Sequence, residues 1–110
     1  MLPLAADFIV ATFFAGLGEA MRLTWDAEKN KANKAKHGIG FEAVERFEWD
    51  QALFEFDDRE DYGELREIAI GFIGVALYVL VFAEADDETV RLISLRPASS
   101  KEASRFARQR

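Results

Sequence analysis

EIAIGFIGVALYVLVFAEADDETVRLISL, residues Glu67–Leu95, is the stretch of this chain that decides the fold. It contains three runs rich in β-branched and aromatic residues, which favour strands. The predicted strands are Glu67–Phe72, Ala76–Phe82 and Val90–Leu95. Gly71 and Gly74 suit a first hairpin turn, and residues 85–88 suit a second. Consecutive hairpins make neighbouring strands antiparallel, so this stretch predicts an antiparallel meander.

Upstream of the meander, Leu53–Phe56 alternates apolar and acidic residues and predicts a further strand at the edge of the sheet. The highly charged residues 57–63 predict a loop between that strand and the meander. We therefore expect a four-stranded antiparallel sheet, with one more short strand around Arg22–Thr24.

Two helices are predicted before the sheet. Asp26 is a good N-cap, and Gly38 is placed as the left-handed residue just past a helix C-terminus, so the first helix lies between them. Phe41, Val44 and Phe47 recur at helical spacing and predict a short second helix.

A third helix is predicted at the C-terminus. Pro97 ends the last strand, and Ser99-x-x-Glu102 is a capping box that opens a helix. The fold class is therefore α+β, with two N-terminal helices, a four-stranded antiparallel meander and a C-terminal helix, the helices lying on one face of the sheet.

Composition restricts the kinds of site that this chain can build. Its 110 residues make one domain with a single modest core. The chain has no cysteine and one histidine, which excludes disulfides, thiolate metal sites and His-rich metal clusters. Carboxylate metal sites stay open in principle, but we predict no metal ion and no cofactor. The absence of cysteine suits a reducing cytoplasm.

The net charge of −6 hides an uneven distribution. Residues 22–40 carry five Lys or Arg against two acids, and residues 91–110 carry six against one. Residues 41–90 hold fifteen acids and three arginines. If the fold brings the two basic ends together, they form one positive face suited to a polyanion.

Residues 1–20 differ from the rest of the chain, being apolar and free of Lys and Arg. The uninterrupted apolar run from Phe8 to Leu17 is shorter than the roughly 20 residues that span a bilayer, and no secretory signal pattern is present. Three interpretations are open: an extra element packed on the domain, a membrane-seeking tail, or an extension upstream of a true start at Met21. We favour the last and expect a non-family extension over 1–20 and a single domain over 21–110.

The segment Trp25–Gly38 carries the most distinctive chemistry. On a helix begun by Asp26, the side chains of Trp25, Lys29, Asn33 and His37 fall four apart and share one face, and Lys36 leans the same way. The helix dipole favours the protonated form of a histidine in the last turn. Such a stripe suits a phosphate-handling surface, although the same residues also fit a solvated helix face with a capping histidine.

The chain resembles the BrnT toxins of bacterial type II toxin–antitoxin systems, from about Arg22 to Phe106. Seven blocks in the right order carry the resemblance. They are Trp25-Asp26 with Lys29, Asn33 and Lys36-His37-Gly38; Phe41-Glu42-Ala43-Val44; Phe47 with Asp50; Arg66 with Ile70-Gly71; Val79-Leu80-Val81-Phe82-Ala83-Glu84; Arg91-Leu92-Ile93-Ser94-Leu95-Arg96; and Ser99 to Glu102. The chain departs from the family pattern at Pro97, where a second basic residue is usual, and in its acidic Glu84–Thr89 hairpin.

The resemblance implies a RelE-like fold and a ribonuclease that arrests translation in the cytoplasm. It also implies inhibition by a cognate BrnA-like antitoxin, usually a ribbon-helix-helix protein that represses its own operon, so operator DNA is met only through the antitoxin. The RNA substrate is either free or on the ribosome.

Metal-independent RNA cleavage needs a base for the ribose 2′-OH, an acid for the 5′-oxygen and cations for the phosphate. His37 is the first choice for acid or base, because only an imidazole titrates near neutrality without special surroundings. Lys36 can stabilise the phosphate or act as a base if desolvated. Glu84, at the end of its strand, is an alternative base, although it also fits an ion pair with an arginine.

The remaining catalytic candidates are three arginines on neighbouring strands, which suit bidentate contact with the reacting phosphate. They are Arg66, Arg91 and Arg96. The last two are five apart, so a regular strand puts them on opposite faces and both serve only if a bulge or the strand end re-aims one. Trp25 is a candidate to stack on a base, beside Lys29 and Asn33 as RNA contacts, although a tryptophan there also fits the core.

Two functions are consistent with these residues. The first is an endoribonuclease toxin. The second is a catalytically weak or inactive toxin-like module that binds its antitoxin and tunes operon repression, which the acidic middle and Pro97 favour. A membrane-associated protein anchored by residues 1–20 is a third alternative.

Overall fold

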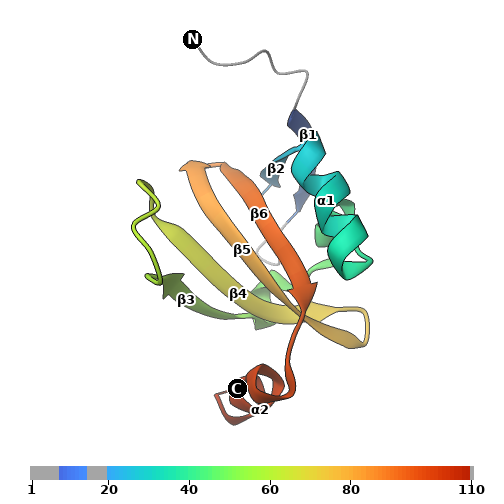
Figure 1. Ribbon diagram of the computed structural model, residues 1–110, viewed down its shortest axis with the longest axis vertical. Coiled ribbons are helices and arrows are strands. Elements are labelled where there is room, and N and C mark those ends of the chain that lie inside the picture. The colour runs from blue at the N-terminus through green and yellow to red at the C-terminus, as the bar shows by residue number, and fades with distance from the viewer. Residues whose placement is uncertain (1–7, 15–19, 110) are drawn as a thin grey trace.

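The computed structural model describes residues 8–14 and 20–109, which form one six-stranded sheet with helical segments around it (Figure 1). The strand order is β1-β2-β6-β5-β4-β3. The strands are β1 (Phe8–Phe14), β2 (Ala20–Asp26), β3 (Leu53–Asp57), β4 (Arg66–Ile73), β5 (Ala76–Asp86) and β6 (Thr89–Pro97). β1 falls within the predicted N-terminal extension, whose residues 1–7 and 15–19 lie outside the described part of the chain.

The predicted meander is confirmed, because β3, β4, β5 and β6 pair consecutively and antiparallel. The extra short strand expected around Arg22–Thr24 is also confirmed, as part of β2, but the prediction that the sheet is purely antiparallel is wrong. β2 adds on as a parallel neighbour of β6 through residues 22–24, and β1 pairs antiparallel with β2 at the edge. The parallel pairing joins segments more than sixty residues apart, which local sequence patterns do not report.

The first predicted helix is confirmed as α1 (Ala27–His37), capped at both ends as expected. The side chain of Asp26 accepts hydrogen bonds from the backbone N–H groups of Glu28 and Lys29, at 2.8 and 3.3 Å. Gly38 has φ +75°, the left-handed conformation in which glycine carries no steric penalty.

The second predicted α-helix is wrong, because Phe41–Arg46 forms a 3₁₀ helix, η2, followed by a second short 3₁₀ helix, η3 (Trp49–Gln51). The apolar residues of this segment recur at intervals of three, which aligns them on one side of a 3₁₀ helix. Gly40 has no side chain to cap its start, and the Asn30 amide oxygen from α1 accepts from the backbone N–H of Phe41 at 2.8 Å instead. The structure therefore has one N-terminal α-helix rather than two.

The C-terminal helix is confirmed as α2 (Ser100–Arg108) with its capping box. The Ser99 hydroxyl accepts from the backbone N–H of Glu102 at 3.1 Å, and the Glu102 carboxylate accepts from the backbone N–H of Ser99 at 2.8 Å.

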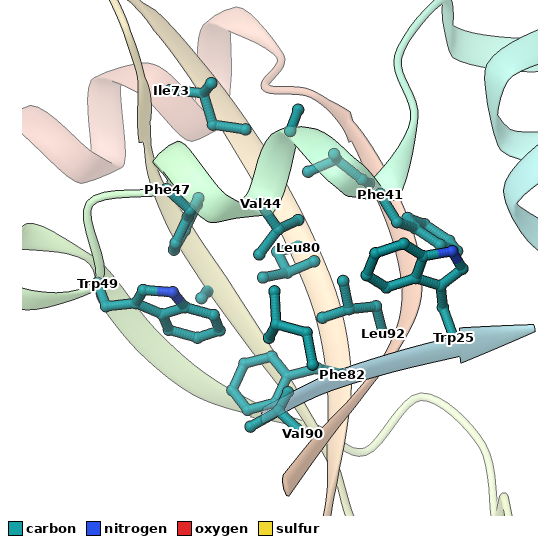
Figure 2. Close-up of a cluster of buried hydrophobic side chains, with 14 residues drawn as sticks. Trp25, Phe41, Val44, Phe47, Trp49, Ile73, Leu80, Phe82, Val90 and Leu92 are labelled. Carbon is teal, nitrogen blue, oxygen red and sulfur yellow. The ribbon is translucent and has the colours of Figure 1, made fainter. Parts of the chain in front are cut away.

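The main core lies between one face of the sheet, here called the core face, and the 3₁₀ segments (Figure 2). Trp25 from β2 packs edge-on against Phe41, with ring centroids 6.1 Å apart. At the other end of this core, Trp49 meets Phe47 and Phe82 edge-on, at 5.0 and 5.4 Å. Burial of these aromatic side chains supplies much of the hydrophobic stabilisation of the domain.

Helical segments lie on both faces of the sheet, so the prediction that they share one face is wrong. α2 packs on the face opposite the main core, where Phe106 is buried with Ile70 and Val79. α2 covers only one end of that face. α1 is separate from α2 and lies beside β6 (Figure 1). Among residues 8–14 and 20–109, no helix is long and apolar enough to cross a membrane.

Candidate functional site

Asn33 fixes α1 against the exposed edge of β6. Its amide nitrogen donates to the backbone oxygens of Leu95 and Ile39, at 2.8 and 2.9 Å, and its amide oxygen accepts from the backbone N–H of Leu95 at 3.1 Å. β2 pairs with only three residues of β6, and beyond them the Asn33 side chain supplies hydrogen bonds to the backbone N–H and oxygen of Leu95. Asn33 was predicted to contact RNA, but an amide that is buried and bonded in this way positions the helix instead.

Trp25 was predicted as a stacking platform for RNA, and the structure places it in the core. Only 2% of its surface is exposed, so neither face of its ring is open to a base. The stripe on α1 therefore reduces to Lys29, Lys36 and His37, with Lys29 and Lys36 exposed and His37 half-buried.

A β-bulge at Ile93 places the strand arginines. Val81 pairs with Ser94 while Phe82 pairs with Leu92, so Ile93 is an extra residue on β6. The extra residue shifts the side-chain alternation by one position, and Arg91 then points to the same face as Ser94 and Arg96. This is the bulge that the odd spacing of the two arginines required.

Arg66 on β4 shares that face, because its alternation partner Ile68 pairs with Val81. We call this side of the sheet, which carries Arg66, Arg91 and Arg96, the arginine face. The three predicted arginines therefore lie together, on the side of the sheet opposite the main core.

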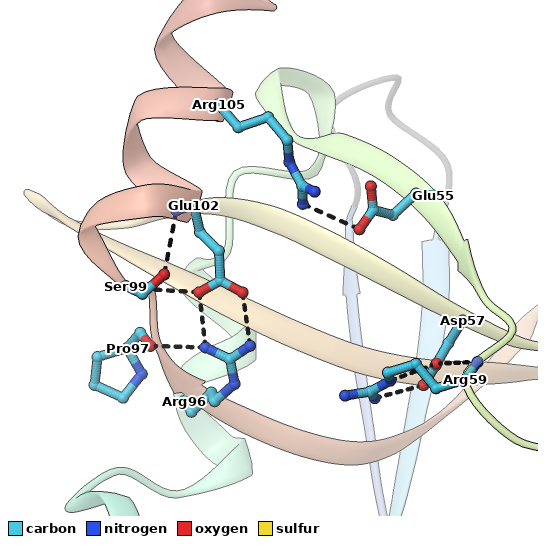
Figure 3. Close-up of polar contacts among 8 residues, drawn as sticks. All are labelled: Glu55, Asp57, Arg59, Arg96, Pro97, Ser99, Glu102 and Arg105. Atoms are coloured by element: carbon cyan, nitrogen blue, oxygen red, sulfur yellow. Dashed lines mark hydrogen bonds and ion pairs between the residues drawn. The ribbon is translucent and has the colours of Figure 1, made fainter.

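Each of these arginines is held by a carboxylate of the same chain. One oxygen of Glu64 accepts from both Arg66, at 3.2 Å, and Arg91. Arg96 makes a bidentate pair with Glu102, at 2.8 and 2.7 Å (Figure 3). The hydrogen bond from Arg91 and the neighbouring Arg66 hold the pKa of Glu64 below its usual range, and Arg96 lowers the pKa of Glu102 to about 2.

The arginine face also contains residues that the sequence did not single out as a site. Arg59, from the loop after β3, forms a bidentate pair with Asp57, with both distances 2.7 Å, and lowers the pKa of that carboxyl to about 2. Arg105 on α2 pairs with Glu55 at 3.0 Å (Figure 3). The sequence placed Glu55 in the edge strand but Asp57 in the loop after it, whereas β3 extends to Asp57, and nothing local indicated the partners of either acid.

These side chains surround a cavity of about 360 Å³ on the arginine face. Its floor is apolar and its rim charged. The floor is formed by Ile68, Val79, Val81 and Ile93, and the rim by Glu55, Asp57, Arg59, Arg66, Arg96, Glu102 and Arg105, with Ser94 at one side.

A second cavity, of about 290 Å³, lies between α1 and β6. It is lined by Lys29, Lys36 and His37 together with Ile93 and Ser94, which also line the first cavity. The arginine face and the cationic stripe of α1 are therefore one continuous surface. A third depression brings Lys29 to Arg91.

The α1 cations differ from the arginines in their partners. Within residues 8–14 and 20–109, Lys29, Lys36 and His37 form no ion pair, whereas Lys34, on another side of the helix, pairs with Glu42 at 2.8 Å. The two basic ends of the chain thus contribute to one face, as the charge distribution predicted.

Glu84, the alternative base, lies away from this surface. It follows Phe82 by two residues on β5 and therefore points to the core face, where its carboxyl lies beside that of Glu67. Burial, together with the Glu84 carboxylate, raises the pKa of Glu67 to about 7. The sheet separates Glu84 from all three arginines, so we remove it from the candidate site.

No group of three or more His, Cys, Asp or Glu side chains in the described ranges is arranged to hold a metal ion.

Comparisons with known proteins agree with this architecture. Residues 25–102 match the family described as "Ribonuclease toxin, BrnT, of type II toxin-antitoxin system". The crystal structure of the Brucella abortus ribonuclease toxin BrnT is similar, with 29% sequence identity and a TM-score of 0.54, over 69% of this chain and 94% of that one. A search of curated proteins found no match.

Proposed function

Because the chain belongs to the BrnT family of ribonuclease toxins of type II toxin–antitoxin systems, we propose that it is an endoribonuclease that acts through the surface shared by α1 and the arginine face. The observation that carries the proposal is the bulge at Ile93. It turns Arg91 to the face that carries Arg66 and Arg96, and residues at the bulge, Ile93 and Ser94, also line the cavity that holds Lys36 and His37.

The reaction is attack of a ribose 2′-oxygen on the adjacent phosphorus. A base removes the 2′-OH proton, the new O–P bond forms, the P–O5′ bond breaks, and an acid protonates the departing 5′-oxygen. His37 is the acid or base, and each such group contributes about 10²–10⁴-fold. Lys36 and the three arginines stabilise the negative charge that accumulates on the phosphate. His37 carries out one of the two proton transfers and Lys36, in the same cavity, the other, so the proposed cleavage needs no metal ion.

The proposed partners follow from the family. A type II toxin has a cognate antitoxin, and we expect a BrnA-like ribbon-helix-helix protein that neutralises this chain and alone contacts operator DNA. RNA cleavage in the cytoplasm, on free RNA or on the ribosome, then inhibits translation and growth.

Induced expression of the full chain tests the proposal, with growth and cellular RNA integrity as the readouts. We expect growth arrest and RNA breakage from the wild type, and relief in His37→Ala and Arg66→Ala. Lys31→Ala, an exposed position on α1 outside the site, is the matched control and should stay toxic. Purified protein should cleave RNA equally with and without EDTA.

One observation favours an alternative, an inactive toxin-like module that binds its antitoxin. All five arginines on and around the arginine face already pair with carboxylates of the chain, so RNA phosphates must compete with them. Intact RNA and normal growth in the presence of folded wild-type protein, together with antitoxin binding, would establish this second function.

A further inference from the structure

The edge of the sheet at β3 carries exposed apolar side chains. β3 is the last strand in the sheet order, at the edge farthest from β1 and α1, and within the described residues β4 is its one strand neighbour (Figure 1). Phe54 and Phe56 on β3 are 47% and 64% exposed, and Leu65, just before β4, is 65% exposed. Of the large hydrophobic residues exposed in the described part of the chain, only Val75 lies elsewhere. Proteins rarely leave such a cluster on an open strand edge, which makes this edge a candidate interaction surface.

The two phenylalanines lie where the main core ends. Phe54 pairs with Ala69 and Phe56 with Glu67, so both rings are on the core face of the sheet. The Phe54 ring stacks on Trp49, with ring centroids 6.4 Å apart and an angle of 15° between the planes. Phe56 comes two residues further along β3 and is the more exposed of the two. A partner strand beside β3 would therefore continue the apolar surface of the core.

The surroundings of Phe56 are acidic. Glu67 is its pairing partner on β4, and Glu84 on β5 lies diagonally from Glu67 on the same face. No lysine or arginine in the described ranges forms an ion pair with Glu67 or Glu84. Residues 55–67 hold seven acids and two arginines, and each arginine pairs with an acid of the same segment. A cation from outside would relieve the repulsion between the two carboxyl groups, so the charge of this edge complements a basic partner.

Other parts of this chain do not supply that cation. Residues 1–20 contain no lysine or arginine. Pairing two copies of the chain along β3 would add the negative charge of residues 55–67 to itself, and a pairing centred on Glu55 would place two carboxylates directly opposite each other. The charge therefore favours a segment of another protein.

We propose that the β3 edge, formed by Phe54, Phe56 and Leu65, docks an extended segment of the antitoxin, which adds to the sheet as a further strand. Its apolar side chains pack on Phe54 and Phe56, and its backbone pairs with the open side of β3. Neighbouring strands lie about 4.8 Å apart, so Glu67 on β4 is about 10 Å from the backbone of the added strand. A Lys or Arg side chain laid across the Phe56 ring reaches the carboxyl group of Glu67 over that distance.

The docked segment would lie beside the proposed catalytic surface. Glu55 and Asp57 of β3 line the rim of the larger cavity on the arginine face. An antitoxin anchored at this edge can extend over that face and keep RNA away from it. The inference rests on the antitoxin partner that the family implies and not on the chemistry of cleavage.

Fluorescence anisotropy with a labelled peptide, Thr-Val-Thr-Val-Thr-Arg-Thr-Arg, tests the docking surface on the full chain, and the reversed sequence covers the opposite strand direction. One of the two should bind at least about tenfold more tightly than its counterpart with glutamate in place of arginine. Phe56→Ser and Glu67→Gln should each weaken that binding about fivefold. The matched controls are Val75→Ser, an exposed apolar residue in the turn between β4 and β5, and Glu28→Gln, an exposed acid on α1, and both should bind as the wild type does.

A peptide with proline in place of the second valine separates strand addition from attraction between charges. It keeps both arginines but cannot pair as a strand, so it should bind at least about fivefold more weakly. Equal binding of the proline peptide, or an unchanged affinity in Phe56→Ser, would overturn the docking edge. A dimer of the full chain that forms without peptide binding and is lost in Phe56→Ser would also overturn it, by assigning the edge to a second copy.

Competition identifies the occupant. The cognate antitoxin should displace the bound peptide, and an antitoxin that binds while the peptide stays in place would overturn the assignment. No readout involves RNA cleavage. Loss of the docking edge would therefore leave the ribonuclease proposal standing, and a folded protein that binds the peptide but leaves RNA intact would count against the enzyme alone.

Discussion

The two faces of the sheet place their carboxylates in opposite surroundings. On the arginine face, Glu64 and Glu102 each lie against arginines, and their pKa values are lowered, that of Glu102 to about 2. On the core face, Glu67 and Glu84 lie against each other, and burial with the neighbouring charge raises the pKa of Glu67 to about 7. The two environments lie on opposite sides of the same sheet.

The arginines of the sheet pair with acids on one face only, and the carboxyl pair of the core face has no ion-pair partner among the described residues. An arginine near Glu67 would relieve the unfavourable carboxyl pair, yet the nearest strand arginine, Arg66, points to the other side. On the arginine face the carboxylates hold long, flexible guanidinium groups in fixed positions. A held cation loses less side-chain entropy when it binds a phosphate, but the carboxylate that holds it also competes with that phosphate for the same N–H donors.

The largest effect on this contrast should come from Glu102→Ala. The change removes half of the capping box of α2 and the bidentate partner of Arg96, so we expect a loss of about 1.5 kcal/mol in the free energy of unfolding. Because the pKa of Glu102 is lowered from 4.5, its contribution is present above about pH 4.5 and lost as the pH falls towards 2. Urea denaturation at pH 3 and pH 7 measures both.

Lys101→Ala is the control for that prediction, since Lys101 is an exposed neighbour on the same helix. Equal losses at pH 7 for the two variants would contradict the structural role given to the Arg96–Glu102 pair.

Local sequence patterns correctly predicted the elements that depend on interactions between residues close together in the sequence. The meander depends on runs of strand-forming residues joined by hairpins, and the ends of α1 and α2 depend on Asp26, Gly38 and the Ser99–Glu102 box. The prediction of a second α-helix was wrong because apolar residues at intervals of three fit an α-helix and a 3₁₀ helix alike.

The composition of the site was harder to predict, because it depends on distant segments. The sequence named Arg66, Arg91 and Arg96, but Arg91 shares their face only because of a bulge at Ile93 that has no local signature. Glu64 meets Arg91 across 27 residues, and Asn33 meets Leu95 across 62. Asn33 was predicted as an RNA contact for the same reason, since the strand that buries it is far away in the chain, whereas for Trp25 the sequence left both a surface and a core position open.

A smaller effect should follow from Glu64→Gln, which removes the negative charge that Arg66 and Arg91 share. Because two arginines then become available to phosphate, we expect RNA affinity to rise about fivefold and its dependence on salt concentration to become steeper. Fluorescence anisotropy with a 2′-O-methyl RNA, which cannot be cleaved, measures this at two salt concentrations.

Glu60→Gln removes the same charge from the same loop without touching an arginine of the site, and it separates a local effect from a change in net charge. If Glu64→Gln binds RNA no better than Glu60→Gln, then Glu64 orients the arginines instead of competing with RNA.

The smallest effect should appear on the core face, in Glu67→Gln. The folded protein holds the Glu67 proton more tightly than the unfolded chain does, because the pKa is about 7 in the fold against an ordinary value of 4.5. The free energy of unfolding of the wild type should therefore fall as the pH rises from about 4.5 to 7, and remain lower above that. Solvent screens a half-buried pair, so the whole change should stay below about 1 kcal/mol.

Thermal unfolding between pH 4 and pH 8 should show Glu67→Gln equal to the wild type at the acid end and more stable at the alkaline end. Glu84→Gln should do the same, because either substitution removes the repulsion between the two carboxylates. Parallel stability profiles for the wild type and both variants would mean that the two faces do not differ in the way that their partners indicate.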